Sequence, residues 1–297
     1  LNAYLYGDAM AISRMAAEAG QTELSQTFRQ KAEAIRDAMN RLLWDGDFYR
    51  TIPCAKGETI DPASRPAVEE NHRVRELTGY LPWYFAMPEK GRESAFRQLM
   101  EPEGFFAPWG LTTAEQRHSR FSFFHEHECL WNGPVWPFAT SQTLTAAARL
   151  LREYPPVDDF IREDYWTLLR QYALSHRLRG EDGRFRPWID EDMDPYTGEW
   201  TARTQLLADH WNPQRGGYER GKDYNHSTFC DLVLDGLLGI STDSNGNLTA
   251  RPLLPDNWAY FRVEGLFHAG KRWTVLYDRD GSHYGRGTGI QIFAEEV

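Results

Sequence analysis

The sequence predicts a mainly helical protein in which paired helices form a barrel or toroid, followed by a small β-rich unit. Apolar residues recur at helical spacing through most of residues 1–240, and long loops rich in glycine, proline and aromatic residues join these helical stretches. After Ile240 the pattern changes to short alternating runs that are typical of strands. We therefore expect two parts, a helical region over residues 1–240 and a β-rich unit over residues 241–297.

Periodic apolar residues predict the individual helices. Two amphipathic stretches, residues 1–18 and 23–43, are separated by Gly20 and predict an antiparallel helical hairpin. In a later helix, Pro156 suits the first helical position. Further helices are expected at residues 73–86, 92–100, 141–152, 156–176 and 227–238, and strands at residues 248–254, 260–266, 272–277 and 289–293.

Composition excludes several classes of function. The net charge is -10, no apolar run approaches the roughly 18 residues of a membrane-spanning helix, and the basic clusters are short, so we expect neither a membrane nor a nucleic acid as partner. Cys54, Cys129 and Cys230 lie far apart, which indicates neither a disulfide framework nor a thiolate zinc site. Aromatic residues make up 14% of the chain, and they either fill a large core or offer flat faces to sugar rings.

An acidic segment between two tryptophans, Trp188 and Trp200, is the first candidate site. It holds five carboxylates within residues 190–199, and such crowding can raise a pKa or orient a water molecule. A calcium loop is not favoured, because Pro195 stands where an EF-hand needs glycine and Thr201 where it needs glutamate. A catalytic or sugar-binding loop and a solvated acidic turn are the two remaining interpretations.

The segment over residues 121–140 is the second candidate. Its alternating His125-Glu126-His127-Glu128 run places two imidazoles or two carboxylates on one face of a strand, but the sequence singles out no third metal ligand. Trp131, Asn132 and Trp136 then combine two indoles and an amide just before a helix, which favours either sugar stacking or a structural corner. A third candidate, Asn225 and His226, precedes the last expected helix, where such residues pack, cap or bind.

These segments resemble a known group of enzymes. The runs Leu1-Asn2-Ala3-Tyr4-Leu5-Tyr6, Trp131-Asn132-Gly133-Pro134-Val135-Trp136 and Glu191-Asp192-Met193-Asp194-Pro195-Tyr196-Thr197-Gly198 are similar to motifs of the glycoside hydrolases of family 63, the mannosylglycerate-hydrolase-like domains and the family 142 β-L-arabinofuranosidase domains. The resemblance implies an (α/α)6 toroid, here incomplete, with about seven helices visible where twelve close the ring.

The resemblance also implies a function, the inverting hydrolysis of a glycan or oligosaccharide. Glu191 matches the family's general base, whereas the family's general acid lies upstream of the segment that begins at Leu1. The acid therefore comes from a missing N-terminal part of the parent chain, or from Asp8, Glu126 or Glu128 in this one.

The expected sugar pocket needs no metal and no cofactor, and such enzymes are often exported to the periplasm or the cell exterior. Two alternatives stay open: a catalytically incomplete fragment that binds carbohydrate, and a metal-dependent hydrolase built on His125 and His127. The residues expected to shape the pocket are Trp131, Asn132, Trp136, Trp188, Asn225 and His226.

Overall fold

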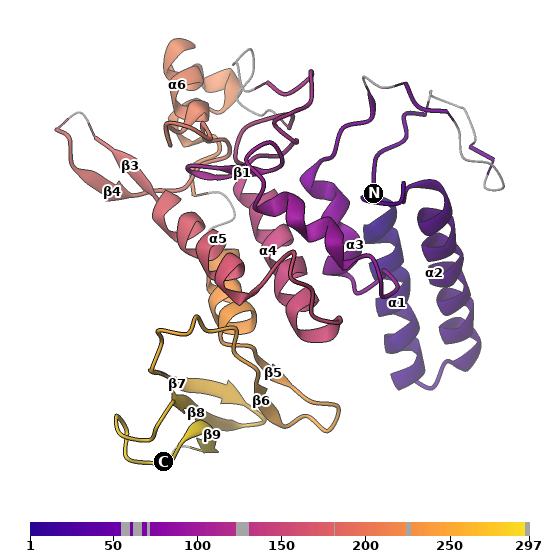
Figure 1. Ribbon diagram of the computed structural model, residues 1–297, viewed down its shortest axis with the longest axis vertical. Coiled ribbons are helices and arrows are strands. Elements are labelled where there is room, and N and C mark those ends of the chain that lie inside the picture. The colour runs from indigo at the N-terminus through magenta and orange to yellow at the C-terminus, as the bar shows by residue number, and fades with distance from the viewer. Residues whose placement is uncertain are drawn as a thin grey trace.

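A computed structural model describes residues 1–54, 60–61, 67–69, 72–122, 131–180, 182–223 and 227–294. Figure 1 shows helices as the main element, with a small group of strands at one end of the molecule. The predicted mainly helical fold with a β-rich C-terminal unit is therefore confirmed. None of the helices in the described ranges is both long and apolar enough to cross a membrane.

The N-terminal helices form the predicted hairpin. Helix α1 spans Asn2–Glu18 and helix α2 spans Thr22–Leu42, close to the bounds expected from the sequence. Their packing buries small residues of α1, and the hydroxyl of Ser13 donates a hydrogen bond of 2.9 Å to the carbonyl of Ser25. Small side chains allow the close approach of the two helices. The hairpin forms one side of the molecule in Figure 1.

The central helices begin and end at different residues from those predicted. Helix α4 spans Pro137–Glu153 and starts earlier, because Pro137 occupies its first turn. Helix α5 spans Arg162–Ser175, and the start predicted at Pro156 is wrong. The carboxylate of Asp164 accepts the backbone N–H of Ile161 at 2.9 Å and so caps α5 later in the chain. The shorter elements are η2 (Leu77–Tyr80), α3 (Leu81–Tyr84) and the 3₁₀ helix η3 (Glu93–Leu99).

Helix α6 (Thr201–Ala208) was not predicted, and it stands at the opposite end of α4 and α5 from the β-rich C-terminal unit (Figure 1). It is followed by 3₁₀ turns and a last helix that continues as a π-helix. These elements are η4 (Pro213–Arg215), η5 (Gly217–Glu219), α7 (Ser227–Asp231) and η6 (Leu232–Leu237).

The strands form small antiparallel sheets. Residues from 240 onward contribute the pair β5 (Ile240–Thr242) and β6 (Leu248–Ala250), and the three-stranded sheet β7–β8–β9 (Tyr260–His268, Lys271–Asp278 and Gly289–Ala294). Strands β6 to β9 lie within or close to the predicted strands, whereas β5 was not predicted. Two short hairpins lie within the helical region. They are β1–β2 (Phe106–Ala107 and Gly110–Leu111) and β3–β4 (Arg177–Arg179 and Phe185–Pro187), of which the second projects from the body in Figure 1.

A cluster of buried aromatic rings holds the first half of the helical region together. The ring of Phe96 is fully buried and lies 4.7 Å from the ring of Tyr80, 5.1 Å from that of Trp83 and 5.7 Å from that of Phe160 (centroid distances). The contact between Phe96 and Trp83 is edge-to-face and the other two are tilted, and such ring contacts add to the free energy gained from apolar burial. The cluster joins η2, α3 and η3 to the segment that leads into α5.

We predict that Phe96→Ala lowers the free energy of unfolding by about 3–5 kcal/mol, because it opens a cavity among packed rings. Phe267→Ala is the matched control, since Phe267 is 77% exposed on β7 and its loss is expected to cost less than about 0.5 kcal/mol. Urea denaturation of both variants measures the two values. Equal values would show that the aromatic cluster contributes no more than surface residues do.

Candidate active site

Backbone pairing brings two of the three candidate segments together. The N–H of Val135 donates to the carbonyl of Met193 at 2.9 Å, and the N–H of Met193 donates back to the carbonyl of Val135 at 3.0 Å. Val135 also bridges to Thr112, and Met193 to Trp200. Since the pairing is antiparallel, continuing it by one residue sets Trp136 across from Asp192, next to Glu191.

The aromatic segment presents a stacked pair of indoles. The rings of Trp131 and Trp136 lie 4.5 Å apart at 31°; Trp131 is 56% exposed, whereas Trp136 is buried. Asn132 is exposed, and its amide nitrogen donates to the carbonyl of Arg120 at 3.2 Å. Trp131 therefore offers a flat apolar face to solvent while Asn132 fixes the loop beside it.

Two buried polar groups lie at the start of α4, and one of them belongs to the indole pair itself. In the described part of the chain, the indole N–H of Trp136 and the hydroxyl of Thr140 have no hydrogen-bond partner. The N–H of Thr140 donates to the carbonyl of Trp136, the N-cap residue, so the two residues lie one turn apart at the start of α4. Buried groups of this kind usually find a partner, and a sugar hydroxyl is one kind of group that supplies it.

The five carboxylates of residues 190–199 have different surroundings. Asp190 and Asp192 are buried, Asp194 accepts the N–H groups of Tyr196 at 2.8 Å and Thr197 at 3.1 Å, and Glu199 is exposed. Asp194 thus stabilises a turn. The carboxylates do not converge on one point, and no group of three or more candidate metal ligands occurs in the described ranges.

Asp190 is the most constrained carboxylate of the acidic segment. It forms a buried ion pair with Arg203 of α6, accepts the indole N–H of Trp188 at 3.2 Å and accepts the N–H of Glu191 at 3.0 Å. Burial raises the pKa of the Asp190 carboxyl, and the positive charge of Arg203 opposes that rise. The cause of the shift is therefore mainly desolvation rather than the crowding of carboxylates expected from the sequence.

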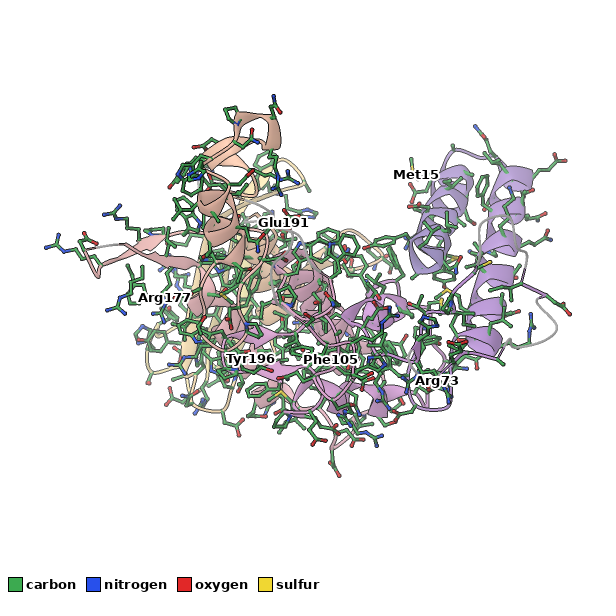
Figure 2. All side chains as sticks on the ribbon, turned by 90° about the horizontal axis from the view of Figure 1, so that it is seen from above. Met15, Arg73, Phe105, Arg177, Glu191 and Tyr196 are labelled. Carbon is green, nitrogen blue, oxygen red and sulfur yellow. The ribbon has the colours of Figure 1, made fainter. Side chains whose placement is uncertain are left out.

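Glu191 follows Asp190 in the chain, and its carboxylate is less constrained than that of Asp190. Its side chain is half-buried, and among the described residues no side chain pairs with its carboxylate. Figure 2 views the molecule from the end opposite the β-rich C-terminal unit, with Glu191 labelled. A carboxylate that is held at its backbone but unpaired at its oxygens can accept a proton from a bound water molecule.

Trp188 is anchored on both sides. Its backbone N–H donates to the carbonyl of His176 at 3.2 Å, and its ring lies 5.6 Å from the ammonium group of Lys222 and 6.0 Å from the ring of Tyr218. Lys222 in turn pairs with Glu219 at 3.0 Å. The indole thus packs against a cation and a second ring, and its role in a sugar pocket stays a prediction.

Several predicted site residues lie outside the described residues, namely Glu126, Glu128, Asn225 and His226, together with the alternative metal ligands His125 and His127. The chain that follows His226 can be placed. Phe229 of α7 packs against His176, 4.9 Å between ring centroids, and the carbonyl of His176 accepts the N–H of Trp188. The third candidate segment therefore leads into a helix that packs on His176, the residue that accepts the backbone N–H of Trp188.

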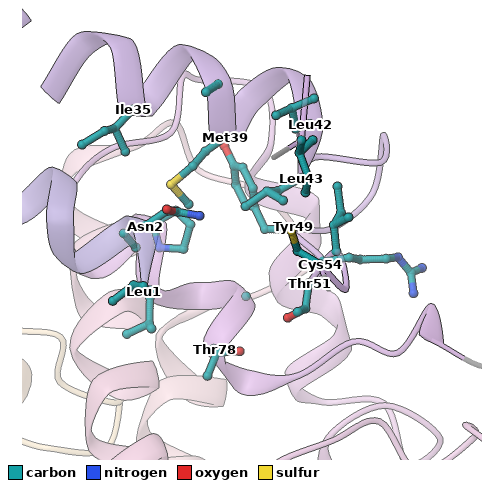
Figure 3. A pocket seen from close by; sticks show the side chains of 18 of the residues that line it. Leu1, Asn2, Ile35, Met39, Leu42, Leu43, Tyr49, Thr51, Cys54 and Thr78 are labelled. Atoms are coloured by element: carbon teal, nitrogen blue, oxygen red, sulfur yellow. The ribbon is translucent and has the colours of Figure 1, made fainter. Parts of the chain in front are cut away.

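Asp8, the other candidate for a second carboxylate, is exposed on α1. No hydrogen bond or ion pair in the described ranges connects Asp8 to the acidic segment, and Figure 2 shows Met15 of the same helix well apart from Glu191. A groove of about 780 Å³ lies near the start of α1 (Figure 3). Aliphatic side chains such as Ile35, Leu42 and Leu81 line it, and no carboxylate among the described residues does, so this lining does not favour glycoside chemistry.

Sequence reasoning missed the residues that fix the acidic segment from behind. Arg203 donates to the carbonyls of Tyr218 and Arg220, and its guanidinium carbon lies 5.4–5.9 Å from the rings of Trp188, Trp211 and Tyr218. The sequence does not distinguish Arg203 from the other arginines. The signal that was available is the density of aromatic and cationic residues over 209–223, which is typical of cation–π packing.

We predict that Gly221→Ala destabilises the protein more than Gly246→Ala does. Both glycines have positive φ, +74° and +78°, so each substitution costs about 1–2 kcal/mol in backbone strain. A methyl group at Gly221 would also lie 2.6 Å from Oδ1 of Asp190, whereas the control position has open space. We expect an additional loss of about 1–3 kcal/mol at Gly221. Equal midpoints and slopes in urea unfolding would contradict the close packing of Gly221 on Asp190.

One solved structure shows a similar fold over nearly the whole of this chain. A protein described as a sialidase superposes with a TM-score of 0.81 at 33% identity, covering 99% of this chain and 24% of that one. A GH63 mannosylglycerate hydrolase from Thermus thermophilus, solved in complex with glucose, gives 0.44 at 19% identity, covering 70% of this chain and 46% of that one. The chain thus spans less than half of the length of either protein.

A family model matches most of the helical region of this chain. The model of the "Mannosylglycerate hydrolase MGH1-like glycoside hydrolase domain" matches residues 1–227, which include α1, both paired motif segments and the start of α7. The match ends before the β-rich unit. The fold class is that of the helical-toroid glycoside hydrolases, with a small β unit at the C-terminus. This chain belongs to the family of MGH1-like glycoside hydrolase domains.

Proposed function

We propose that the chain carries the general base and part of the sugar pocket of an inverting glycoside hydrolase. Glu191 is the base, and Trp131, Trp136 and Trp188 form the aromatic part of the pocket. Asn132, Asn225 and His226 are proposed to add polar contacts to the sugar. Family membership supports the class of reaction, since the family is one of glycoside hydrolases.

One observation carries the assignment of the site: the backbone pairing of Val135 with Met193. It joins the segment that carries the exposed indole of Trp131 to the segment that carries Glu191, although 60 residues separate these two in the sequence. Aromatic faces bind the apolar faces of sugar rings, and a carboxylate next to such a ring lies within reach of the anomeric carbon of the bound sugar. The buried indole N–H of Trp136 and the buried hydroxyl of Thr140 favour a polar ligand at the start of α4.

In this mechanism one water molecule lies between Glu191 and the anomeric carbon of the bound sugar. Glu191 accepts a proton from the water as the oxygen bonds to carbon, and a carboxylic acid on the other side protonates the departing glycosidic oxygen. The two carboxyl groups of an inverting enzyme stand about 6.5–9.5 Å apart, which leaves room for the water. The product therefore has the opposite anomeric configuration to the substrate.

The general acid is proposed to come from a part of the parent protein outside this chain, while Glu126 and Glu128, the other candidates, lie outside the described residues. Asp190 forms an ion pair with Arg203, and the carboxylate of Asp194 accepts the N–H of Tyr196 in a turn. Neither carboxylate therefore suits the role of a proton donor across the sugar. Asp8 lies exposed on α1 without a contact to the acidic segment in the described ranges. On this proposal, the chain by itself binds sugar and the full-length protein hydrolyses it.

We predict that Glu191→Gln in the full-length protein lowers kcat by at least about 10²-fold, because an amide cannot accept the proton of the water. Glu199→Gln is the control: Glu199 is exposed in the same segment and its loss is expected to leave the rate nearly unchanged. The assay uses mannosylglycerate and a panel of 4-nitrophenyl glycosides, with the anomer of the first product followed by NMR. Full turnover by Glu191→Gln would overturn the assignment of the base, and a retained anomer would overturn inversion.

We predict that Trp131→Ala weakens sugar binding roughly 10-fold, the equivalent of about 1.4 kcal/mol of lost stacking. Phe267→Ala removes another exposed ring, on β7, and is expected to leave binding unchanged. Calorimetric titration in the Glu191→Gln background measures both without consuming the ligand. Equal affinities for the two variants would show that the indole pair is a structural corner and not a sugar platform.

A further inference from the structure

Asp190 connects three parts of the candidate site through one carboxylate. We infer that Asp190 is the positioning residue of this site, and that its ion pair with Arg203 holds Glu191 in the direction needed to activate water. The inference rests on the proposed role of Glu191 as general base. It assigns to Asp190 no contact with the sugar; the residue acts through its neighbour.

The two oxygens of Asp190 have separate tasks. Oδ1 accepts the N–H of Glu191 at 3.0 Å, and Oδ2 accepts the indole N–H of Trp188 at 3.2 Å. A carboxylate fixed at both oxygens fixes the backbone on which the next side chain stands. The same group therefore sets the direction of Glu191 and the tilt of the Trp188 ring.

Arg203 prevents Asp190 from turning. Its guanidinium pairs with Asp190 and also donates to the carbonyls of Tyr218 and Arg220, so it joins α6 to the chain that runs behind the acidic segment. Arg203 is 7% exposed and Asp190 is fully buried. A planar guanidinium binds three acceptors at fixed angles, which a lysine ammonium cannot do with the same geometry.

The chain behind Asp190 completes the support. Gly221 lies so close to Oδ1 of Asp190 and to Cβ of Glu191 that a methyl group there would be 2.6 Å from the first and 3.4 Å from the second. The N–H of Asp223 donates to the carbonyl of Ile189 at 2.9 Å. The base thus stands between a buried ion pair and a fitted backbone, where a shift of about 1 Å costs about 10²-fold in rate.

A double-mutant cycle tests the inference in the full-length protein, with the glycoside that the wild type hydrolyses best among mannosylglycerate and the 4-nitrophenyl glycosides. We expect Asp190→Asn to lower kcat about 10–100-fold with a smaller change in KM. In the Glu191→Gln background we expect the same substitution to lower the residual kcat by less than about threefold, because the base through which Asp190 acts is gone. A general structural role would lower both rates equally.

Controls separate positioning from misfolding. Asp209→Asn removes a nearby carboxylate that pairs with Arg215 at 3.3 Å on the surface, and we expect it to leave kcat unchanged. Near-ultraviolet circular dichroism checks that each variant is folded at the assay temperature. If Asp190→Asn does not fold, Arg203→Lys takes its place, since it keeps the positive charge and loses the planar geometry.

The outcomes are distinct. Loss of activity by Asp190→Asn that disappears in the Glu191→Gln background supports the positioning role. An equal loss in both backgrounds, or none in the wild-type background, overturns it. Full activity of Glu191→Gln alone would instead overturn the proposed function, so the two failures are distinguishable.

Discussion

The pairing of Val135 with Met193 is the constraint on which the candidate site depends. Both residues lie in irregular segments, and both are buried. Buried backbone N–H and C=O groups need partners, and loops seldom supply them internally. Two loops that satisfy each other, extended by Thr112 on one side and Trp200 on the other, behave as a minimal sheet without regular strands. This explains how two long loops hold a fixed geometry at the end of a helical layer.

Periodicity predicted the hairpin of α1 and α2 and the strands after residue 240, because these elements each present one apolar face. It failed where a local hydrogen bond decided the boundary: Asp164, and not Pro156, caps α5. Helix α6 was missed because it is short and follows an acidic loop. For the site, sequence motifs predicted both paired segments. They could not predict Arg203, since its importance arises from acceptors on Tyr218 and Arg220 that the chain brings near only when folded.

The acidic composition of the chain hides a local concentration of positive charge. The net charge is -10, yet Arg203 and Lys222 lie directly behind the acidic segment, each over aromatic rings. Aromatic faces attract cations electrostatically, so the rings help to keep these charges near the carboxylates in a partly dry environment. Within the segment, the positive charge of Arg203 offsets the negative charge of Asp190. A sequence-level net charge describes solubility and says little about this local balance.

The paired loops and the β-rich unit occupy opposite ends of α4 and α5 (Figure 1). Arg152, near the end of α4, donates to the carbonyls of Gly236 and Arg251 and so attaches the C-terminal unit to the helices at the far side from Glu191. A substitution at one end of these helices therefore has little direct effect on the contacts at the other end. Such a separation favours evolvability, because the paired loops can vary in sequence without changing the contacts of the terminal sheet.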